Sequence, residues 1–469
     1  MRCPDPLPER DQAVENHQPA NSGRVDIGLP GTEGSSRKLP WVWTAFVLWL
    51  LVQVPTFVGQ AEQGKSPINF LAYRAAADAL ERGESPYGTP ERRLQRFREI
   101  HQAETDLRSA AARGEAPAML QELEAREQQP GLYLYPPTLA RLISGLRLNG
   151  LAFAGLILLS MVGFGRLWLG GPGASSHWLL LIMFSWDVLA SWYGGNVELV
   201  LLGGTLAAAR LLWTRHTLLA APLIAPVVLI KPFYAMFFVT FGLLQLVSRP
   251  TEAGATLRSL AAGAALALAI MATEVDRWGA TLRAQTFDYL LHGVDYLWFV
   301  LPPADQTPLS AWNRTPLQAL VSAGLPATTA QRAALGLWLL FVVITLRRAW
   351  WSQLAFPPAF ALSLILLYWG RPVGWGLIYL EVVLVVAAWP SLRGWQRGGL
   401  LGALLALMAS HWWALVLTLR GAGMSLFTLQ SADFPWETWS VLPLAWLLLL
   451  KTVSHTTARH GQRMGASSP

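Results

Sequence analysis

Cysteine and charge are what this sequence has least of. Its 469 residues include one cysteine, Cys3, which excludes an intrachain disulfide. Charged residues make up 14% of the chain, well below the roughly 25% of a typical soluble domain. No cluster of histidine and cysteine has the spacing of zinc ligands, so we expect no metal ion. These scarcities argue against a disulfide-stapled domain and against an ordinary soluble one.

Acidic residues are also outnumbered. Lys and Arg total 36 and Asp and Glu total 29, which gives a formal net charge of +7. A basic balance occurs in nucleic-acid-binding proteins, but here the basic residues stand mostly at the ends of apolar segments. The bias of Lys and Arg toward the cytoplasmic ends of membrane spans explains that placement better. We therefore expect no nucleic-acid partner.

Long apolar runs take the place of charge, since 53% of the residues are hydrophobic. Residues 40–59 contain no charge and, at about 1.5 Å per residue, are long enough to cross a hydrocarbon core of roughly 30 Å. Further runs follow at 148–169, 178–192, 197–213, 218–230, 232–247, 257–271, 333–346, 357–369, 376–389, 400–417 and 441–450. They predict an all-α integral membrane protein with about twelve transmembrane helices, some tilted or re-entrant.

Basic residues set the expected topology. Arg37 and Lys38 precede the first run, and with alternating spans most other arginines fall on the same side of the membrane. This bias predicts an inner-membrane protein with both termini in the cytoplasm. We expect 1–38 to be a disordered tail, 39–455 the membrane domain and 456–469 a second cytoplasmic tail.

Two polar segments, 60–135 and 274–331, are expected to be large extracytoplasmic loops that carry amphipathic helices. The first begins with 69–80, where apolar residues recur at helical spacing. Within it, 90–127 alternates charges of both signs, which is typical of solvated helices. We interpret 90–127 as an insert with a structural or partner role.

Three basic residues on the outward side are candidates for binding an anion. Lys231 stands between two apolar runs, where a lysine is costly in lipid, and is either functional or a snorkelling residue at a helix end. Arg314 and Arg371 have guanidinium groups that match phosphate oxygens, although each also suits an interfacial anchor. A lipid-carried substrate with a phosphate at the interface would need such cations.

Two acidic residues flank a predicted outward turn. Asp187 and Glu198 each suit either a buried ion pair or a catalytic role, and the sequence leaves both interpretations open. Among the tryptophans near the outward loops, Trp375 has a ring that could stack on a sugar.

An ordered set of residues in the first loop matches a known pattern. It consists of Asn69, Phe70, Tyr73, Ala76, Ala77, Ala79, Leu80, Gly83, Pro86, Tyr87, Tyr135, Pro136 and Pro137. The chain thereby resembles glycosyltransferase family 87, the polyprenol-phosphate-mannose-dependent mannosyltransferases of the GT-C superfamily. Weaker echoes are Gly195 to Glu198, Lys231 before a proline, and Asn313. The likeness spans 40–389 and leaves the 90–127 insert outside it.

The resemblance implies a GT-C-like fold and a hexosyltransferase. Such an enzyme moves a sugar, mannose in the family, from a polyprenyl-phosphate donor to a glycolipid or glycan acceptor outside the cytoplasm. It implies a monomer without a cofactor. The residues implied to bind substrates are Tyr73, Tyr87, Tyr135, Lys231, Asn313, Arg314, Trp375 and Tyr379.

Two departures from the family pattern bear on catalysis. Asn69 occupies the position of the loop aspartate that looks like the general base, and a carboxamide cannot accept that proton. The segment 374–379 also lacks the family's histidine. Glu62 is the first substitute base, followed by Asp187, Glu198 and Asp295. The alternative is a catalytically inactive relative that binds or moves lipid-linked sugars.

Overall fold

The fold is all-helical wherever the computed structural model describes it. The described residues are 40–62, 68–87, 135–169, 188, 192, 195–214, 216–280, 282–284, 315–350, 352, 354–371, 387, 389, 392, 394–402 and 446–450, and they contain no strand. All of them belong to the unit Leu39–Pro469. The predicted tails 1–38 and 456–469, the 90–127 insert and 285–314 of the second loop lie outside these residues.

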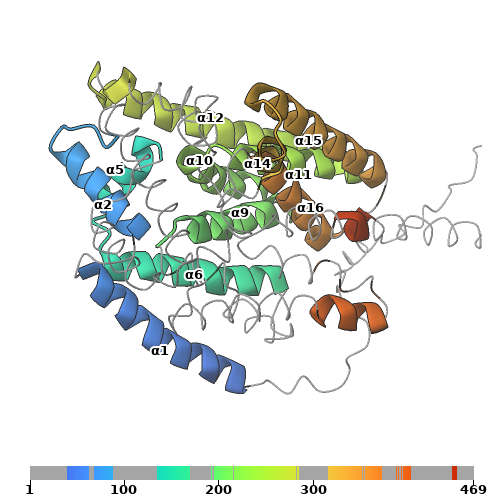
Figure 1. The fold of residues 1–469 in the computed structure, drawn as a ribbon, viewed down its shortest axis with the longest axis horizontal. Helices are drawn as coiled ribbons and strands as arrows, with labels where there is room; N and C mark the ends of the chain where they lie inside the picture. Colours follow the sequence, from blue (N-terminus) through green and yellow to red (C-terminus); the bar gives the residue numbers. More distant parts are fainter. Residues whose placement is uncertain are drawn as a thin grey trace, which may run out of the picture. The chain divides into compact units, whose positions relative to one another are not determined.

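The helices lie where the apolar and amphipathic patterns predict them (Figure 1). The helix expected over 69–80 is confirmed as α2. In α12 and α15 the helix continues into the edges of the segment predicted as the second loop. The bounds are α1 Pro40–Glu62, α2 Ile68–Glu81, α5 Pro137–Gly145, α6 Gly150–Leu169, α9 Glu198–Trp213, η1 Thr217–Ala220, α10 Ala221–Ile230, α11 Tyr234–Ser248, η2 Pro250–Glu252, α12 Ala253–Arg277, α14 Pro316–Ser322, α15 Ala327–Ala349 and α16 Phe356–Gly370.

Two of the described helices are long and apolar enough to cross a membrane. They are Pro250–Arg277, which contains α12, and Thr328–Ala349 within α15. A third span is possible by length if α5 and α6 count as one broken segment, because their axes bend by 112° at a short break. The expected number of about twelve spans stays a prediction.

Four helices around the centre of the fold are shorter than a hydrocarbon core. α9, α10, α11 and α16 have 16, 10, 15 and 15 residues, or roughly 15–24 Å at the usual helical rise. Helix ends at membrane depth leave backbone groups that must be satisfied inside the protein. The ends of these helices therefore favour polar side chains, and Glu198, Lys231 and Arg371 lie at three of them.

Proline fixes two of those helix ends. Lys231 follows α10 with extended backbone, φ −133° and ψ 95°, and Pro232 comes next. Arg371 follows α16 with φ −74° and ψ 142°, and Pro372 comes next in the sequence. A residue before proline disfavours the helical conformation, so each helix stops at its cation. A cation at a helix C-terminus is also stabilised by the partial negative charge at that end of the helix dipole.

Aromatic packing joins the amphipathic helix α2 to the bundle. The Phe70 ring lies 4.8 Å from the Phe153 ring of α6 and 6.5 Å from the Phe57 ring of α1. All three side chains are buried. α2 also packs along α5, while α6 runs beside α9 and α11 beside α16 (Figure 1). This packing holds α2 and α5 against the bundle, near the residue where α9 begins.

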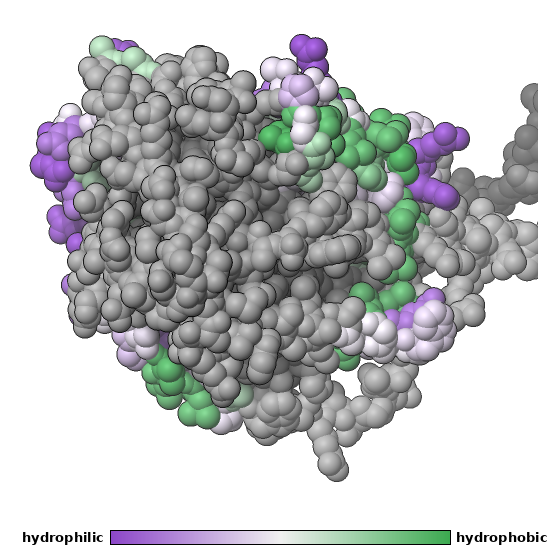
Figure 2. Space-filling model, in the orientation of Figure 1, coloured by the Kyte–Doolittle hydropathy of each residue, from purple (hydrophilic) through white to green (hydrophobic). Residues whose placement is uncertain are grey.

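Large apolar side chains are exposed along three helices. In the space-filling view, hydrophobic patches lie beside hydrophilic ones on the described surface (Figure 2). A surface of this kind marks contact with lipid or protein rather than with water. The exposed residues include Val47, Leu48, Leu51 and Val52 of α1, Leu257, Leu266 and Leu268 of α12, and Leu335, Leu339, Leu340 and Val343 of α15.

Candidate functional site

Glu198 is a buried carboxyl at the first residue of α9, with 3% of its surface exposed. Gly195 supplies the turn before it with φ 61°, a conformation that side chains other than glycine rarely adopt. The Asn196 Oδ1 accepts a hydrogen bond of 2.9 Å from the Glu198 backbone N–H. A negative side chain in the first helical turn is stabilised by the helix dipole. The local sequence thus places an acid where α9 begins.

Two cations contact that carboxyl. The Lys231 Nζ is paired with Glu198 Oε2. The Arg371 Nη1 lies 3.3 Å from Glu198 Oε1, and its guanidinium carbon lies 3.9 Å from the centre of the Tyr368 ring. The side chain of Arg371 is 7% exposed and that of Lys231 is 22% exposed. Lys231 is therefore the more accessible cation.

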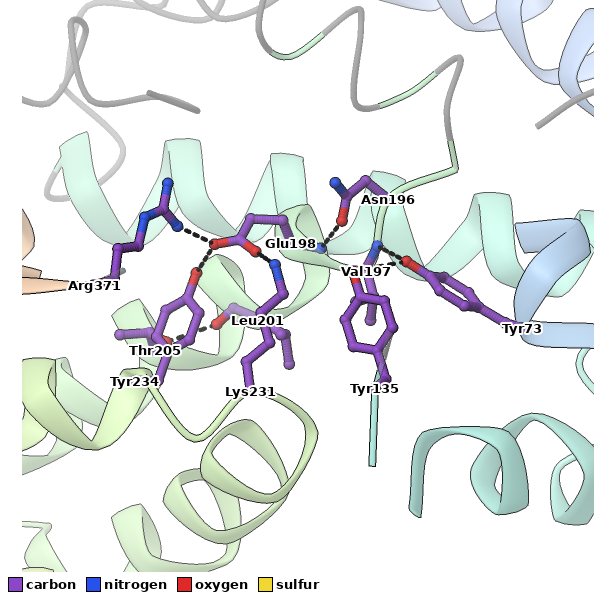
Figure 3. A network of polar contacts seen from close by, with 10 residues as sticks. All are labelled: Tyr73, Tyr135, Asn196, Val197, Glu198, Leu201, Thr205, Lys231, Tyr234 and Arg371. Atoms are coloured by element: carbon purple, nitrogen blue, oxygen red, sulfur yellow. Dashed lines mark hydrogen bonds and ion pairs between the residues drawn. The ribbon is translucent and has the colours of Figure 1, made fainter. Parts of the chain in front are cut away.

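Tyr234 completes the contacts around Glu198. Its hydroxyl donates a hydrogen bond of 2.7 Å to Glu198 Oε1, and its side chain is buried. Tyr234 is the first residue of α11, and its backbone N–H is bonded to the Lys231 carbonyl at 3.0 Å. Figure 3 shows Lys231, Tyr234 and Arg371 converging on the carboxyl from three helix ends. The network therefore ties α9, α10, α11 and α16 together.

The charges of this network do not cancel among the described residues. Lys231 and Arg371 contribute two positive charges and Glu198 one negative charge, so the trio carries a net charge of +1. Charges removed from water are costly unless they are paired. The N-terminus of α9 adds a partial positive charge at the same place. Such a site suits an anionic group.

Three tyrosines of the first loop lie next to the ionic network. The Tyr73 hydroxyl contacts the Tyr135 hydroxyl at 3.2 Å and accepts a hydrogen bond of 3.4 Å from the Val197 N–H. The Tyr87 hydroxyl donates a 2.9 Å hydrogen bond to the Tyr135 carbonyl. The Lys231 Nζ lies 5.5 Å from the centre of the Tyr135 ring, within reach of a cation–π contact. These three tyrosines are thereby joined to Lys231.

Tyr73 lies in α2, and its environment disfavours ionisation. Burial raises the pKa of the Tyr73 hydroxyl well above its usual value, and the neighbouring Tyr135 raises it further. The positive charge of Lys231 acts in the opposite direction but does not outweigh burial. Tyr73 therefore stays neutral and acts as a hydrogen-bonding group.

Four of the residues predicted to bind substrate, Tyr73, Tyr87, Tyr135 and Lys231, are linked through these contacts. No protein-family model, curated protein or solved structure matches this chain. Two of the three weaker echoes also meet in the network, since Glu198 of the Gly195–Glu198 motif is paired with Lys231 (Figure 3). Three tyrosines of the pattern and two of its weaker echoes thus belong to one connected set of contacts around the Glu198 carboxyl.

Other predicted residues lie elsewhere. Asn69 is half-buried one helical turn before Tyr73, and no hydrogen bond joins its side chain to another described residue. Glu62, the first substitute base, is the exposed last residue of α1. The remaining predicted positions lie outside the described residues, namely Asp187, Asp295, Asn313, Arg314, Trp375 and Tyr379.

The structure brings Arg371, one of the candidate cations named from the sequence, into the site and adds Tyr234. Arg371 has a sequence signal, because it resembles Lys231 in ending an apolar run directly before a proline. Tyr234 has no signal beyond its position three residues after Lys231. Pairing across 173 residues, as between Arg371 and Glu198, is set by tertiary packing.

Metal ligands do not cluster in the part of the chain that the structure describes. No group of three or more His, Cys, Asp and Glu side chains gathers there. Within the described residues, the site consists of the Glu198 carboxyl, the two cations and the tyrosines. That the protein works without a metal ion stays a prediction.

Proposed function

We propose that the protein is a membrane glycosyltransferase that transfers a hexose from a polyprenyl-phosphate donor to an acceptor on the extracytoplasmic side. Mannose is the sugar that the family resemblance favours. One observation carries the proposal: two cations meet at a single buried carboxyl beside the tyrosines of the outward loop. A positively charged site among apolar helices suits a phosphate on a lipid chain.

In this proposal the two substrates approach from different sides. The donor phosphate binds at Lys231 and Arg371, where a guanidinium and an ammonium can contact its oxygens. The acceptor lies toward α2 and the tyrosines Tyr73 and Tyr135, which present a ring and hydroxyl groups. The membrane fold that we propose around this site has about twelve spans and is GT-C-like, with both termini cytoplasmic.

Replacing Lys231 tests the donor site. Lys231→Ala removes a charge-assisted contact worth about 1.5–3 kcal/mol, so we expect donor affinity to fall about 10- to 100-fold. The measurement is binding of radiolabelled mannosyl-phosphoryl-polyprenol to full-length protein in phosphatidylethanolamine and phosphatidylglycerol liposomes. Arg258→Ala, which removes an exposed cation of α12, is the control and should bind as the wild type does. Equal affinity in both variants would contradict the proposal.

A second candidate is a protein that binds or moves lipid-linked sugars without transferring them. Asn69 is the observation that favours it, because the resemblance puts the general base at this position. The two candidates differ in turnover. Binding of the donor without release of labelled mannose to octyl α-mannopyranoside or to water would favour the second candidate.

A further inference from the structure

We propose that Glu198 takes the proton of the acceptor hydroxyl, after the donor phosphate has displaced it from Lys231 and Arg371. This inference rests on the proposed function and adds the residue that replaces the missing aspartate. In this inference Glu198 is the counter-ion of Lys231 and Arg371 before the donor binds, and it is the general base once the donor is bound. The argument depends on position, charge and the chemistry of the transfer.

Position favours Glu198 over the other acids at hand. Asn69 has a carboxamide, which has no basic oxygen of the required strength. Glu62 ends α1 and is exposed to solvent. Glu198 contacts both cations and lies next to Val197, whose N–H is bonded to Tyr73. Among the described acids it is the one that contacts both Lys231 and Arg371.

In the structure, the Glu198 carboxylate is the anion that Lys231 and Arg371 bind. The Glu198 carboxylate makes the contacts with Lys231 and Arg371 that phosphate oxygens would make. Lys231 is the accessible partner, with 22% of its side chain exposed against 4% for Glu198. An arriving phosphate therefore meets Lys231 first and competes with Glu198 for its charge.

Displacement changes what the carboxylate can do. A carboxylate that neutralises two cations accepts a proton poorly, whereas one relieved of them by phosphate regains its affinity for a proton. The Tyr234 hydroxyl, at 2.7 Å from Oε1, keeps the side chain in place during this exchange. Glu198 is thus a weak base until the donor is bound.

The reaction leaves the net charge of the site unchanged. With a phosphodiester donor bound, Lys231 and Arg371 face the negative charges of the Glu198 carboxylate and of the phosphate. During transfer, Glu198 gains the acceptor proton and becomes neutral. The phosphate becomes a monoester with a second negative charge, which offsets the charge that Glu198 loses. A buried site gains from this constancy because an uncompensated charge is costly there.

The transfer itself balances in atoms and electrons. The acceptor oxygen forms a bond to the anomeric carbon, while its proton passes to a Glu198 carboxylate oxygen. The bond between the anomeric carbon and the phosphate oxygen breaks, and its electron pair stays on the phosphate. Lys231 and Arg371 then stabilise the phosphate charge that develops. No oxidant or further reactant is needed.

The decisive variant is Glu198→Gln, studied in full-length protein in the liposomes described above. Donor affinity should be unchanged or higher, because a competing negative charge has been removed. The kcat for transfer from mannosyl-phosphoryl-polyprenol to octyl α-mannopyranoside should fall about 10²- to 10⁴-fold, the range for loss of a general base. A purely structural Glu198 predicts the reverse, with weaker donor binding and a proportionate loss of turnover.

A second variant decides the matter if Glu198→Gln does not fold. Glu198→Asp keeps the carboxylate but withdraws it from the substrate, so kcat should fall at least about tenfold with donor affinity retained.

The outcomes separate this inference from the function on which it rests. Transfer by Glu198→Gln or Glu198→Asp at the wild-type kcat, or loss of donor binding by a folded Glu198→Gln, would overturn the role of Glu198 and leave the glycosyltransferase standing. A wild-type protein that neither binds nor cleaves mannosyl-phosphoryl-polyprenol would remove the proposed function itself. Transfer by the wild type, together with a Glu198→Gln variant that binds the donor but does not transfer the sugar, would support both the proposed function and the role of Glu198.

Discussion

Tyr73 is the residue through which helix α2 reaches the site. Its hydroxyl contacts Tyr135 and the backbone at the start of α9, and its side chain is buried. Because these contacts use the neutral phenol, they belong to the protonated form. Its raised pKa therefore links the stability of this corner of the fold to pH.

The sign of that link is testable. With a folded-state pKa above the unfolded value of about 10, Tyr73 contributes stability that is present below that pH and is lost as pH rises. Tyr73→Phe should have a lower Tm near neutral pH, and its difference from the wild type should narrow as the pH rises above about 10. Tryptophan fluorescence during thermal unfolding in detergent measures this. Parallel Tm curves would mean that Tyr73 is not the group responsible.

At the residue scale, the sequence predicts half of the site. Lys231 can be predicted because a lysine between apolar runs is costly in lipid and therefore indicates a functional site. The loop tyrosines can be predicted because they follow a family pattern. Glu198 and Arg371 remain ambiguous from sequence, since the same residue types form structural ion pairs. Their pairings with Lys231 and Glu198 cross 33 and 173 residues, which only the packed fold decides.

At the element scale, Gly370 lets α15 approach the end of α16 that carries Arg371. A Cβ at Gly370 would lie 2.6 Å from Trp338 Nε1 and 2.8 Å from Trp338 Cδ1. That indole N–H donates a 2.9 Å hydrogen bond to the Leu366 carbonyl. The absence of a side chain at Gly370 therefore helps fix the helix end from which Arg371 reaches Glu198.

Gly370→Ala should disturb that contact. We expect a loss of about 1–3 kcal/mol in the free energy of unfolding, the usual cost of forcing atoms into a packed interior. Gly336→Ala in α15 is the matched control, because its Cβ would meet nothing within 4 Å. That variant should be neutral or gain up to about 1 kcal/mol from better helix propensity. Thermal unfolding of both variants in one detergent gives the comparison, and equal shifts would count against the tight contact.

The sequence predicts the positions of the helices better than their ends. Apolar runs mark α6, α9, α11 and α12 because a buried or lipid-facing helix is hydrophobic all round. The end of α12 is harder, because Glu274 in its last turns looks like loop sequence. In the fold Glu274 is paired with Arg141 of α5 at 2.7 Å, so a charged residue is accommodated in the helix. The 112° bend between α5 and α6 likewise has no clear sequence signal.

For the whole molecule, the exposed apolar surface distinguishes contact with lipid from contact with water. Spin labels at Leu268→Cys and Leu340→Cys, on a Cys3→Ser background, report on α12 and α15, where the native side chains are 69% and 53% exposed. In liposomes we expect collisions with oxygen to exceed those with a water-soluble nickel chelate, because oxygen concentrates in hydrocarbon. Arg82→Cys, at an exposed position after α2, is the control and should show the opposite order. The same order at all three positions would contradict the membrane orientation proposed here.

The hydrogen bond from Tyr87 to the Tyr135 carbonyl has a consequence for how this chain tolerates change. It brings together two residues that are 48 positions apart in the sequence. The entropic cost of closing a chain segment grows only slowly with its length. We therefore expect changes in the number of residues between positions 87 and 135 to cost little, and the contacts of Tyr73 and Lys231 should persist. Residues gained or lost there would leave the contacts around Glu198 unchanged.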